Sequence, residues 1–143
     1  MFLNPTEYVG KRVRFSAYVK TAGAAGDTVG STGLWMRVDG STQMLGFDNM
    51  SSRPIRTRAD WVRYEVVLDV PAGAIGIALG ALIWRPGEAW IDDAELEIVP
   101  TTVATTGPPV RDTPVDPGMI ARMLENYRTS PSRPLNLGFE IRP

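Results

Sequence analysis

Apolar and polar residues alternate with a period of two along most of the first hundred residues. Between residues 11 and 20, Val13, Phe15, Ala17 and Val19 share one face, and polar or charged residues share the other. Strict alternation is typical of a strand with one buried face. The same alternation predicts strands at residues 33–39, 61–70 and 90–99, and in the last of these it places every second residue from Trp90 to Ile98 on one face. Residues 74–84 are apolar on both faces, which predicts a strand in the middle of a sheet, and residues 42–48 are expected as a short partner of 33–39.

Segments rich in glycine, proline and polar residues separate these strands. Residues 22–31 are small and polar enough to predict a loop, and Asp39-Gly40 favours a tight hairpin turn before the strand at 42–48. Residues 49–60 read as a surface connection. Several short strands joined by turns, with no helix between them, predict an all-β, antiparallel β-sandwich of the jelly-roll type over residues 1–100.

The pattern changes after residue 100. Residues 101–116 are rich in proline and threonine and predict a linker that runs extended over the surface, without burying enough apolar area to order itself. Asp116 followed by Pro117 is a helix start signal. A short helix is therefore expected at roughly 117–128, with an apolar stripe that must dock on the sandwich or on another subunit; its members are Met119, Ile120, Met123, Leu124 and Tyr127.

Composition excludes several function classes. The 143 residues include no cysteine and no histidine, which removes thiol nucleophiles, thiolate metal sites and the commonest general base. A net charge of −1 argues against nucleic acid as a partner. No apolar run approaches the roughly 20 residues that span a bilayer, and the first residues lack the features of a signal peptide, so a cytoplasmic protein without membrane partners is expected.

Four segments together resemble the galactose-binding-like superfamily of jelly rolls, which includes carbohydrate-binding modules, and especially the module appended to some bacterial transcription regulators. The resemblance rests on residues 10–20, on Asp60-Trp61, on Tyr64 to Pro71 and on Trp90-Ile91-Asp92-Asp93. It covers about residues 8–99 and 134–141 and implies a sandwich fold. Fold alone does not fix function.

The end of the chain reads like the opening strand of that family. In the family, a strand like Asn136-Leu137-Gly138-Phe139-Glu140 comes first, and further strands precede the counterpart of residues 10–20. Here those strands are missing, so the chain looks truncated or permuted. A sheet edge then needs cover, and residues 135–141 would add as a final strand, in cis or in a partner. A strand-exchanged homodimer through residues 117–141 is the resulting hypothesis.

The resemblance also implies a structural calcium ion. Family members often hold calcium between the glutamate of the opening strand and an aspartate near the last strand, which corresponds here to Glu140 with Asp92 or Asp93. Carboxylate oxygens suit calcium. The alternative is that the two aspartates cap a turn and bind backbone amides. No other cofactor is expected.

Outward-facing aromatic residues are the candidate ligand site. Tyr18, Trp35 and Arg37 could line up across adjacent strands, and Trp84 could join them, which would give a platform for stacking and hydrogen-bonding a sugar ring. In the alternative, these rings lie beneath the helix and pack on its apolar stripe. Trp61 and Trp90 are expected in core or strand-end packing.

Two charged groups favour weaker hypotheses. The cluster of Arg53, Arg56, Arg58 and Arg63 could grip an anion, but a solvated loop explains it as well. Carboxylates on neighbouring strand positions point to opposite faces and do not form an acid–base pair, so hydrolysis is not expected. The sequence therefore predicts a non-catalytic module that binds a carbohydrate or other small molecule. The alternative is an assembly protein whose tail pairs subunits.

Overall fold

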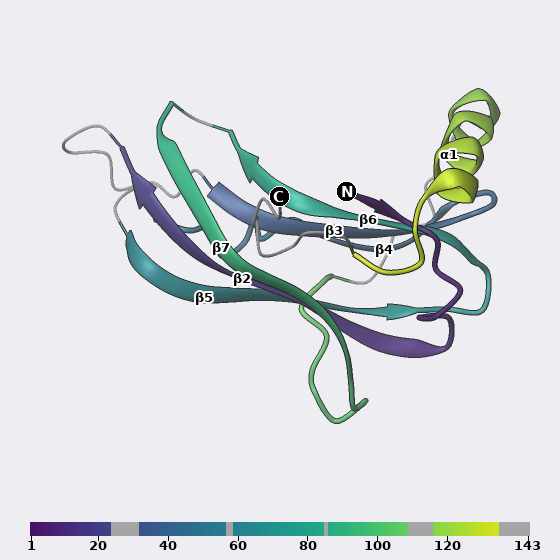
Figure 1. Cartoon of the computed structure of the whole chain (residues 1–143), viewed down its shortest axis with the longest axis horizontal. Helices are drawn as coiled ribbons and strands as arrows, with labels where there is room; N and C mark the ends of the chain where they lie inside the picture. Colours follow the sequence, from purple (N-terminus) through teal and green to yellow (C-terminus); the bar gives the residue numbers. More distant parts are fainter. Residues whose placement is uncertain (24–31, 57–58, 85, 109–115, 135–143) are drawn as a thin grey trace, which may run out of the picture.

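The computed structural model describes residues 1–23, 32–56, 59–84, 86–108 and 116–134, and these residues form two antiparallel sheets packed face to face with one helix at one end (Figure 1). The all-β sandwich predicted from the alternation is confirmed. The predicted final strand at 135–141 lies outside the described residues. The strands are β1 (Phe2–Leu3), β2 (Lys11–Ala22), β3 (Thr32–Gly40), β4 (Met44–Asp48), β5 (Ala59–Val70), β6 (Ala74–Ile83) and β7 (Glu88–Val99).

Sheet A has the strand order β1-β6-β3-β4, and sheet B has the order β5-β2-β7. The core lies between them because one face of each central strand is apolar: Val13, Phe15 and Val19 of β2 oppose Leu34 and Val38 of β3, and all are buried. These are the faces that the period of two predicts.

β3 and β4 form the predicted hairpin, with Val38 opposite Gly46 across the pair. The predicted position of its turn is wrong: Asp39 and Gly40 still belong to β3, and the chain turns at residues 41–43, where the Gly40 N–H donates to the Gln43 carbonyl at 2.8 Å. The two-residue strand β1 was not predicted from the sequence, because it is too short to show a period. Phe2 pairs with Ala78 and Leu3 with Ile77, so the N-terminus completes one edge of sheet A.

A β-bulge changes the predicted faces of β7. Ser16 pairs with Glu95 and Tyr18 with Asp92, so Asp93 and Ala94 together oppose the single residue between them on β2. Asp93 has a φ of 47°, which is the left-handed conformation that a bulge residue can adopt. The sequence predicts one continuous face from Trp90 to Ile98, and that prediction is wrong because the bulge turns Trp90 outward while Ala94 faces the core.

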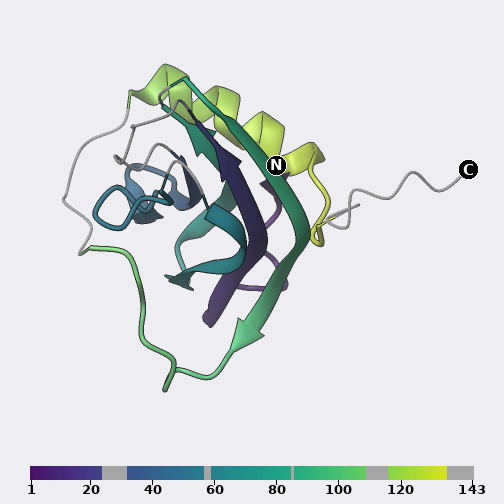
Figure 2. The ribbon, with the colours of Figure 1, turned by 90° about the vertical axis from the view of Figure 1, so that its left-hand side faces the viewer.

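The segment after β7 is better ordered than its composition predicts. It passes round the sandwich toward the free edge of β5 (Figure 2), where the Thr106 backbone N–H donates to the Val67 carbonyl at 2.9 Å. Arg12 also donates to the carbonyl of Thr101 at 2.7 Å. Residues 101–108 are therefore tied to the sandwich by hydrogen bonds, which compensate for their lack of apolar side chains.

Helix α1 (Pro117–Thr129) begins where Asp116 and Pro117 predict it. The Asp116 carboxylate accepts from the Gly118 backbone N–H at 3.2 Å, which is an N-cap contact. The helix docks through Tyr127, which is 1% exposed. Met119 and Leu124 are exposed, so these two residues do not dock on the sandwich, and their docking on another subunit stays a prediction. Within the described ranges, no helix has both the length and the apolar character needed to cross a membrane.

Candidate functional site

The outer face of sheet A carries three of the four predicted ligand-binding residues. Along β3, Leu34 and Met36 are fully buried in the core, so Trp35 and Arg37 between them point outward. The neighbouring strand β6 presents small residues beneath them: Gly80 lies opposite Trp35, and Ala78 lies opposite Arg37. The large side chains of Trp35 and Arg37 therefore lie next to small residues of β6.

Trp35 and Trp84 use glycines to lie close to the sheet. A methyl group at Gly80 would be 3.1 Å from Nε1 of Trp35. One at Gly33 would be 2.8 Å from the Asn49 carbonyl oxygen, 3.1 Å from Cβ of Met50 and 3.2 Å from Cη2 of Trp84. Residues 49 and 50 therefore cover Gly33, and Trp84 lies beside them. Gly33 and Trp35 are two residues apart on β3 and share a face, so both indoles belong to the same surface. Trp35 is half-buried, and Trp84 remains 42% exposed. We call Trp35, Arg37 and Trp84 the tryptophan face.

Arg37 connects this face to a buried carboxylate. Its Nε lies 3.0 Å from Oδ2 and 2.9 Å from Oδ1 of Asp39, which is almost fully buried. Burial opposes the charge on Arg37, but Asp39 outweighs it and raises the pKa of the guanidinium. The contact holds Arg37 against the sheet while part of its side chain stays in solvent.

Tyr127 of the helix closes the other end of the same sheet face. Its ring lies on Gly76, where a methyl group would overlap the ring, and it meets Phe2 edge-on with centroids 5.7 Å apart. Its hydroxyl donates to Oδ2 of Asp39. Burial and this hydrogen bond raise the pKa of Tyr127 above its usual range. The helix therefore covers the Gly76 end and leaves Trp35 and Trp84 outside its contact with the sheet.

Tyr18 does not join the tryptophan face. It lies on β2 in sheet B, between Arg63 of β5 and Asp92 of β7 in the register, and its ring points away from the core. The two outer faces are on opposite sides of the sandwich, so the predicted alignment of Tyr18 with Trp35 is wrong. Alternation within one strand gives a side chain's face, but it does not say which sheet holds the strand.

Trp61 and Trp90 follow the strand-end alternative and not the core alternative. Both side chains are 44% exposed and lie near the beginnings of β5 and β7. Trp90 lies opposite Lys20 on β2. The two tryptophans flank the end of sheet B and give that outer face aromatic residues of its own.

Ion pairs cover much of the remaining outer face of sheet B. Arg12 pairs with Asp69 at 2.7 Å, and Arg14 with Glu97 at 2.9 Å. Arg63 pairs with Glu95 at 2.9 Å and also donates to Ser16. These charges stabilise a solvated surface by modest amounts.

The predicted arginine cluster is divided in the structure. Arg53 is held by the buried carboxylate of Asp48, at 2.5 Å, and Arg63 faces Glu95 on the outer side of sheet B. Burial opposes the charge on Asp48, but the donors around it outweigh that cost and lower its pKa. Arg58 lies outside the described residues. Arg53 and Arg63 are thus occupied by carboxylates, which argues against a shared anion site.

One contact agrees with the alternative in which Asp92 and Asp93 bind backbone amides. Oδ1 of Asp92 accepts from the Asp93 backbone N–H at 2.9 Å. Two carboxylates supply fewer oxygens than the roughly six to eight that calcium takes, and Glu140 lies outside the described residues. Within the described ranges, no group of three or more acidic side chains is placed to hold a metal ion. The calcium hypothesis stays a prediction.

Sequence reasoning missed three residues that organise this surface. The sequence predicts Asp39 only as part of a turn, Phe2 in no element and Gly76 only as a member of the strand at 74–84. The one usable signal was Gly76, since a glycine in a central strand marks a place where another group comes close. That group is the ring of Tyr127, which reaches the strand from 51 positions further along the chain.

Comparison with known proteins gives one informative relative. The chain is 41% identical over 100 residues to a protein of Bacillus subtilis (strain 168) named as the uncharacterized HTH-type transcriptional regulator YbfP. The match covers 69% of this chain and 32% of the relative, so the chain spans about a third of the relative's length. No family model matches the chain, and no solved structure matches it. An all-β fold with this similarity is compatible with a module appended to a regulator.

Proposed function

We propose that this chain is a non-catalytic module that binds a carbohydrate or another small molecule on the tryptophan face. The observation that carries the proposal is the pair of indoles on one sheet face: Trp35 lies over Gly80 with Arg37 next to it on β3, and Trp84 lies at the edge of Gly33 and remains largely exposed. Aromatic faces stack on the apolar side of a sugar ring, and a guanidinium donates to its hydroxyl groups. Arg37 meets Asp39 through Nε and also hydrogen-bonds Tyr127, so the part of its guanidinium that stays in solvent would serve the ligand.

The flat geometry favours binding over catalysis. The chain contains no cysteine or histidine, and the carboxylate nearest the tryptophan face, Asp39, is buried and bonded to Arg37 and Tyr127. A carboxylate held in this way positions its partners and is not free to act as a base. The matched relative is also named as a regulator and not as an enzyme.

The relative suggests a role for such binding. A module that resembles a third of an HTH-type regulator would act as its ligand-sensing part, and the bound molecule would be the signal. We also assign the sandwich to the galactose-binding-like jelly rolls. This assignment is supported by its two antiparallel sheets and by the position of Trp90 to Asp93 in the last described strand.

A titration of the protein with a panel of mono- and oligosaccharides, followed by calorimetry, tests the proposal. For a saccharide that binds, we expect Trp35→Ala and Trp84→Ala each to weaken binding at least about tenfold, as removal of a central aromatic anchor does. Tyr18→Ala is the matched control, because it removes an exposed ring from the opposite sheet. Equal losses in all three variants, or no saccharide that binds, would contradict the proposal.

Assembly is the second candidate function, and the helix favours it. Met119 and Leu124 are exposed on α1, and a groove of about 600 Å³ lies between the helix and residues 4–6 and 74–75. A second copy of the chain would bury these apolar side chains in a homodimer. Light scattering tests this directly: a dimer that Leu124→Lys dissociates and Arg122→Lys leaves intact supports it, and a monomer at high concentration rejects it.

A further inference from the structure

The two edge strands of sheet B, β5 and β7, differ in whether another segment covers them. Val67 lies on the outer edge of β5, and both of its backbone groups are bonded: its N–H donates to Thr106 Oγ1 at 2.8 Å, and its carbonyl accepts from the Thr106 N–H at 2.9 Å. Gly107 then packs against Leu68 and the backbone of Phe47, which belongs to sheet A. Residues 105–108 thus cover the β5 edge and close that side of the sandwich.

The β7 edge has no such cover in the described part of the chain. β7 is 12 residues long and pairs there with β2 alone. Its core-facing side chains lose burial along the strand: Ala94 is buried, Leu96 is half-buried and Ile98 is 52% exposed. A long edge strand with an exposed apolar side chain is a place where another strand adds.

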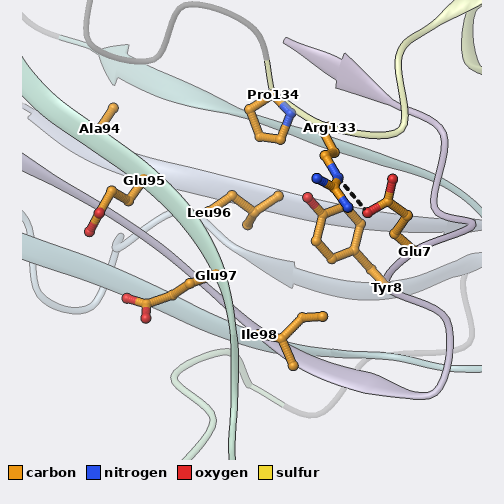
Figure 3. A pocket seen from close by; sticks show the side chains of 9 residues that line it. All are labelled: Glu7, Tyr8, Ala94, Glu95, Leu96, Glu97, Ile98, Arg133 and Pro134. Atoms are coloured by element: carbon orange, nitrogen blue, oxygen red, sulfur yellow. Dashed lines mark hydrogen bonds and ion pairs between the residues drawn. The ribbon is translucent and has the colours of Figure 1, made fainter.

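A cleft of about 490 Å³ opens along this edge (Figure 3). Leu96 and Ile98 of β7 form one wall, and Tyr8, Arg133 and Pro134 form the other. Tyr8 is buried and belongs to the core cluster, so the cleft reaches from solvent to the core. The full lining consists of Glu7, Tyr8, Ala94, Glu95, Leu96, Glu97, Ile98, Arg133 and Pro134.

The chain itself is anchored at the mouth of this cleft. The Pro131 carbonyl accepts from the Asn4 N–H at 3.0 Å. Glu7 accepts from Ser132 Oγ at 2.9 Å and from Arg133 Nε at 2.6 Å. Residue 134 therefore lies across the cleft from Leu96 and Ile98, so the residues that follow begin close to the β7 edge.

Residues 135–141, which follow Pro134, have the alternating sequence pattern of a strand with one apolar face. Leu135, Leu137, Phe139 and Ile141 alternate with Asn136, Gly138 and Glu140. In an extended strand, the four apolar side chains share one face. We propose that residues 135–141 of the same chain add as a strand to the free edge of β7, with the apolar face over Leu96 and Ile98. Seven residues extend to about 23 Å, enough to follow more than half of β7.

Hydrogen exchange on the whole chain tests this placement. Amides of an edge strand alternate between the paired and the free side, so about half of the β7 amides would exchange rapidly if the edge were open. We expect slow exchange along β7 in the full chain and a loss of protection for the free-side amides in a version that ends at Pro134. Equal exchange in both versions would overturn the proposal.

A full-length variant guards against misfolding of the shortened chain. Leu137→Asp puts a charge on the apolar face, and Asn136→Asp puts the same charge on the polar face. We expect the first to expose β7 amides and the second to leave them protected. If both variants leave β7 protected, residues 135–141 do not cover the edge.

Engineered cysteines identify which copy supplies the strand, since the chain has no cysteine of its own. Ile98→Cys is combined in turn with Leu135→Cys, Leu137→Cys and Phe139→Cys. We expect one pair to form a disulfide within a monomer far faster than Glu125→Cys, on the exposed side of the helix, combined with the same tail cysteines. A disulfide-linked dimer would overturn the same-chain placement and show strand exchange between copies.

Discussion

Two aromatic surfaces share the outer face of sheet A, and they differ in what covers them. At one end the ring of Tyr127 lies on Gly76, is 1% exposed and donates to the buried carboxylate of Asp39. At the other end Trp35 lies on Gly80 and Trp84 beside Gly33, and Trp84 is 42% exposed. Both ends use the same device, an aromatic ring laid on a strand glycine.

This difference suggests a structural role for the Tyr127 end and a ligand-binding role for the tryptophan face. At the Tyr127 end, the chain supplies its own helix to fill the surface, and the polar groups there are paired with one another. At the tryptophan face the Trp84 ring and part of Arg37 stay in solvent, and Asp39 fixes Arg37 between the two ends. An ordered apolar surface that the protein does not cover with its own helix is where a ligand gains most from displacing water.

Removing the Tyr127 ring or the Trp84 ring should give the largest difference in unfolding free energy between the two ends. Tyr127→Ala leaves a cavity over Gly76 and removes the hydroxyl that donates to the buried Asp39 carboxylate, which keeps only its contact with Arg37. We expect this change to cost about 3–5 kcal/mol of unfolding free energy. Trp84→Ala removes a ring that is largely in solvent, and we expect a change within about 0.5 kcal/mol. Urea denaturation measures both. Similar losses would mean that the tryptophan face is part of the core.

Glycine substitutions sharpen the same comparison. Gly76→Ala places a methyl group inside the Tyr127 ring, which is buried and cannot move aside, so we expect a loss of about 1–3 kcal/mol. Gly80→Ala meets Trp35 at 3.1 Å, and this half-buried ring can shift, so its loss should be smaller. Thermal unfolding of the pair gives the difference. A greater loss at Gly80 would contradict the assignment of which ring is fixed.

High pH should weaken the packing at the Tyr127 end and leave the tryptophan face unchanged. The pKa of Tyr127 is raised in the folded protein above its ordinary value near 10. Its contribution to stability is therefore complete below about pH 10 and is lost as pH rises toward the folded pKa. We expect the unfolding free energy to fall above pH 10, and Tyr127→Phe to weaken that dependence. An unchanged slope in the variant would show that other groups cause the alkaline loss.

The smallest expected effect is a change in iodide quenching at the tryptophan face. Iodide should quench part of the tryptophan emission, since Trp61, Trp84 and Trp90 are each more than two-fifths exposed. We expect Trp84→Phe to reduce the quenched fraction, and Tyr127→Phe to leave it unchanged. Emission that iodide barely affects would show that these rings are covered in solution.

Local pattern predicted most of the fold because each strand's buried face is written in its own residues. The period of two in β2 and β3, the pairing of β3 with the next strand and the Asp116 cap needed no information from elsewhere in the chain. The faces of β7 were wrong because the bulge at Asp93 inserts one residue, and nothing in the local composition marks it.

The candidate site was predicted only in part, because a site depends on which strands become neighbours. Trp35, Arg37 and Trp84 do share a surface, since β3 and β6 pair along most of their length. Tyr18 belongs to the other sheet, which periodicity cannot reveal. The contact between Tyr127 and Asp39 joins residues 88 positions apart and follows only from the docking of the helix.

The four tryptophans provide the most direct test of the open surface. Trp35 and Trp84 lie on the outer face of sheet A, whereas Trp61 and Trp90 belong to sheet B. An ¹⁵N-labelled sample gives one indole N–H signal for each of them, which can be followed by NMR while a bound saccharide is added. The account predicts that the signals of Trp35 and Trp84 move and that those of Trp61 and Trp90 stay in place. Movement confined to Trp61 and Trp90 would contradict it and place the ligand on the opposite sheet.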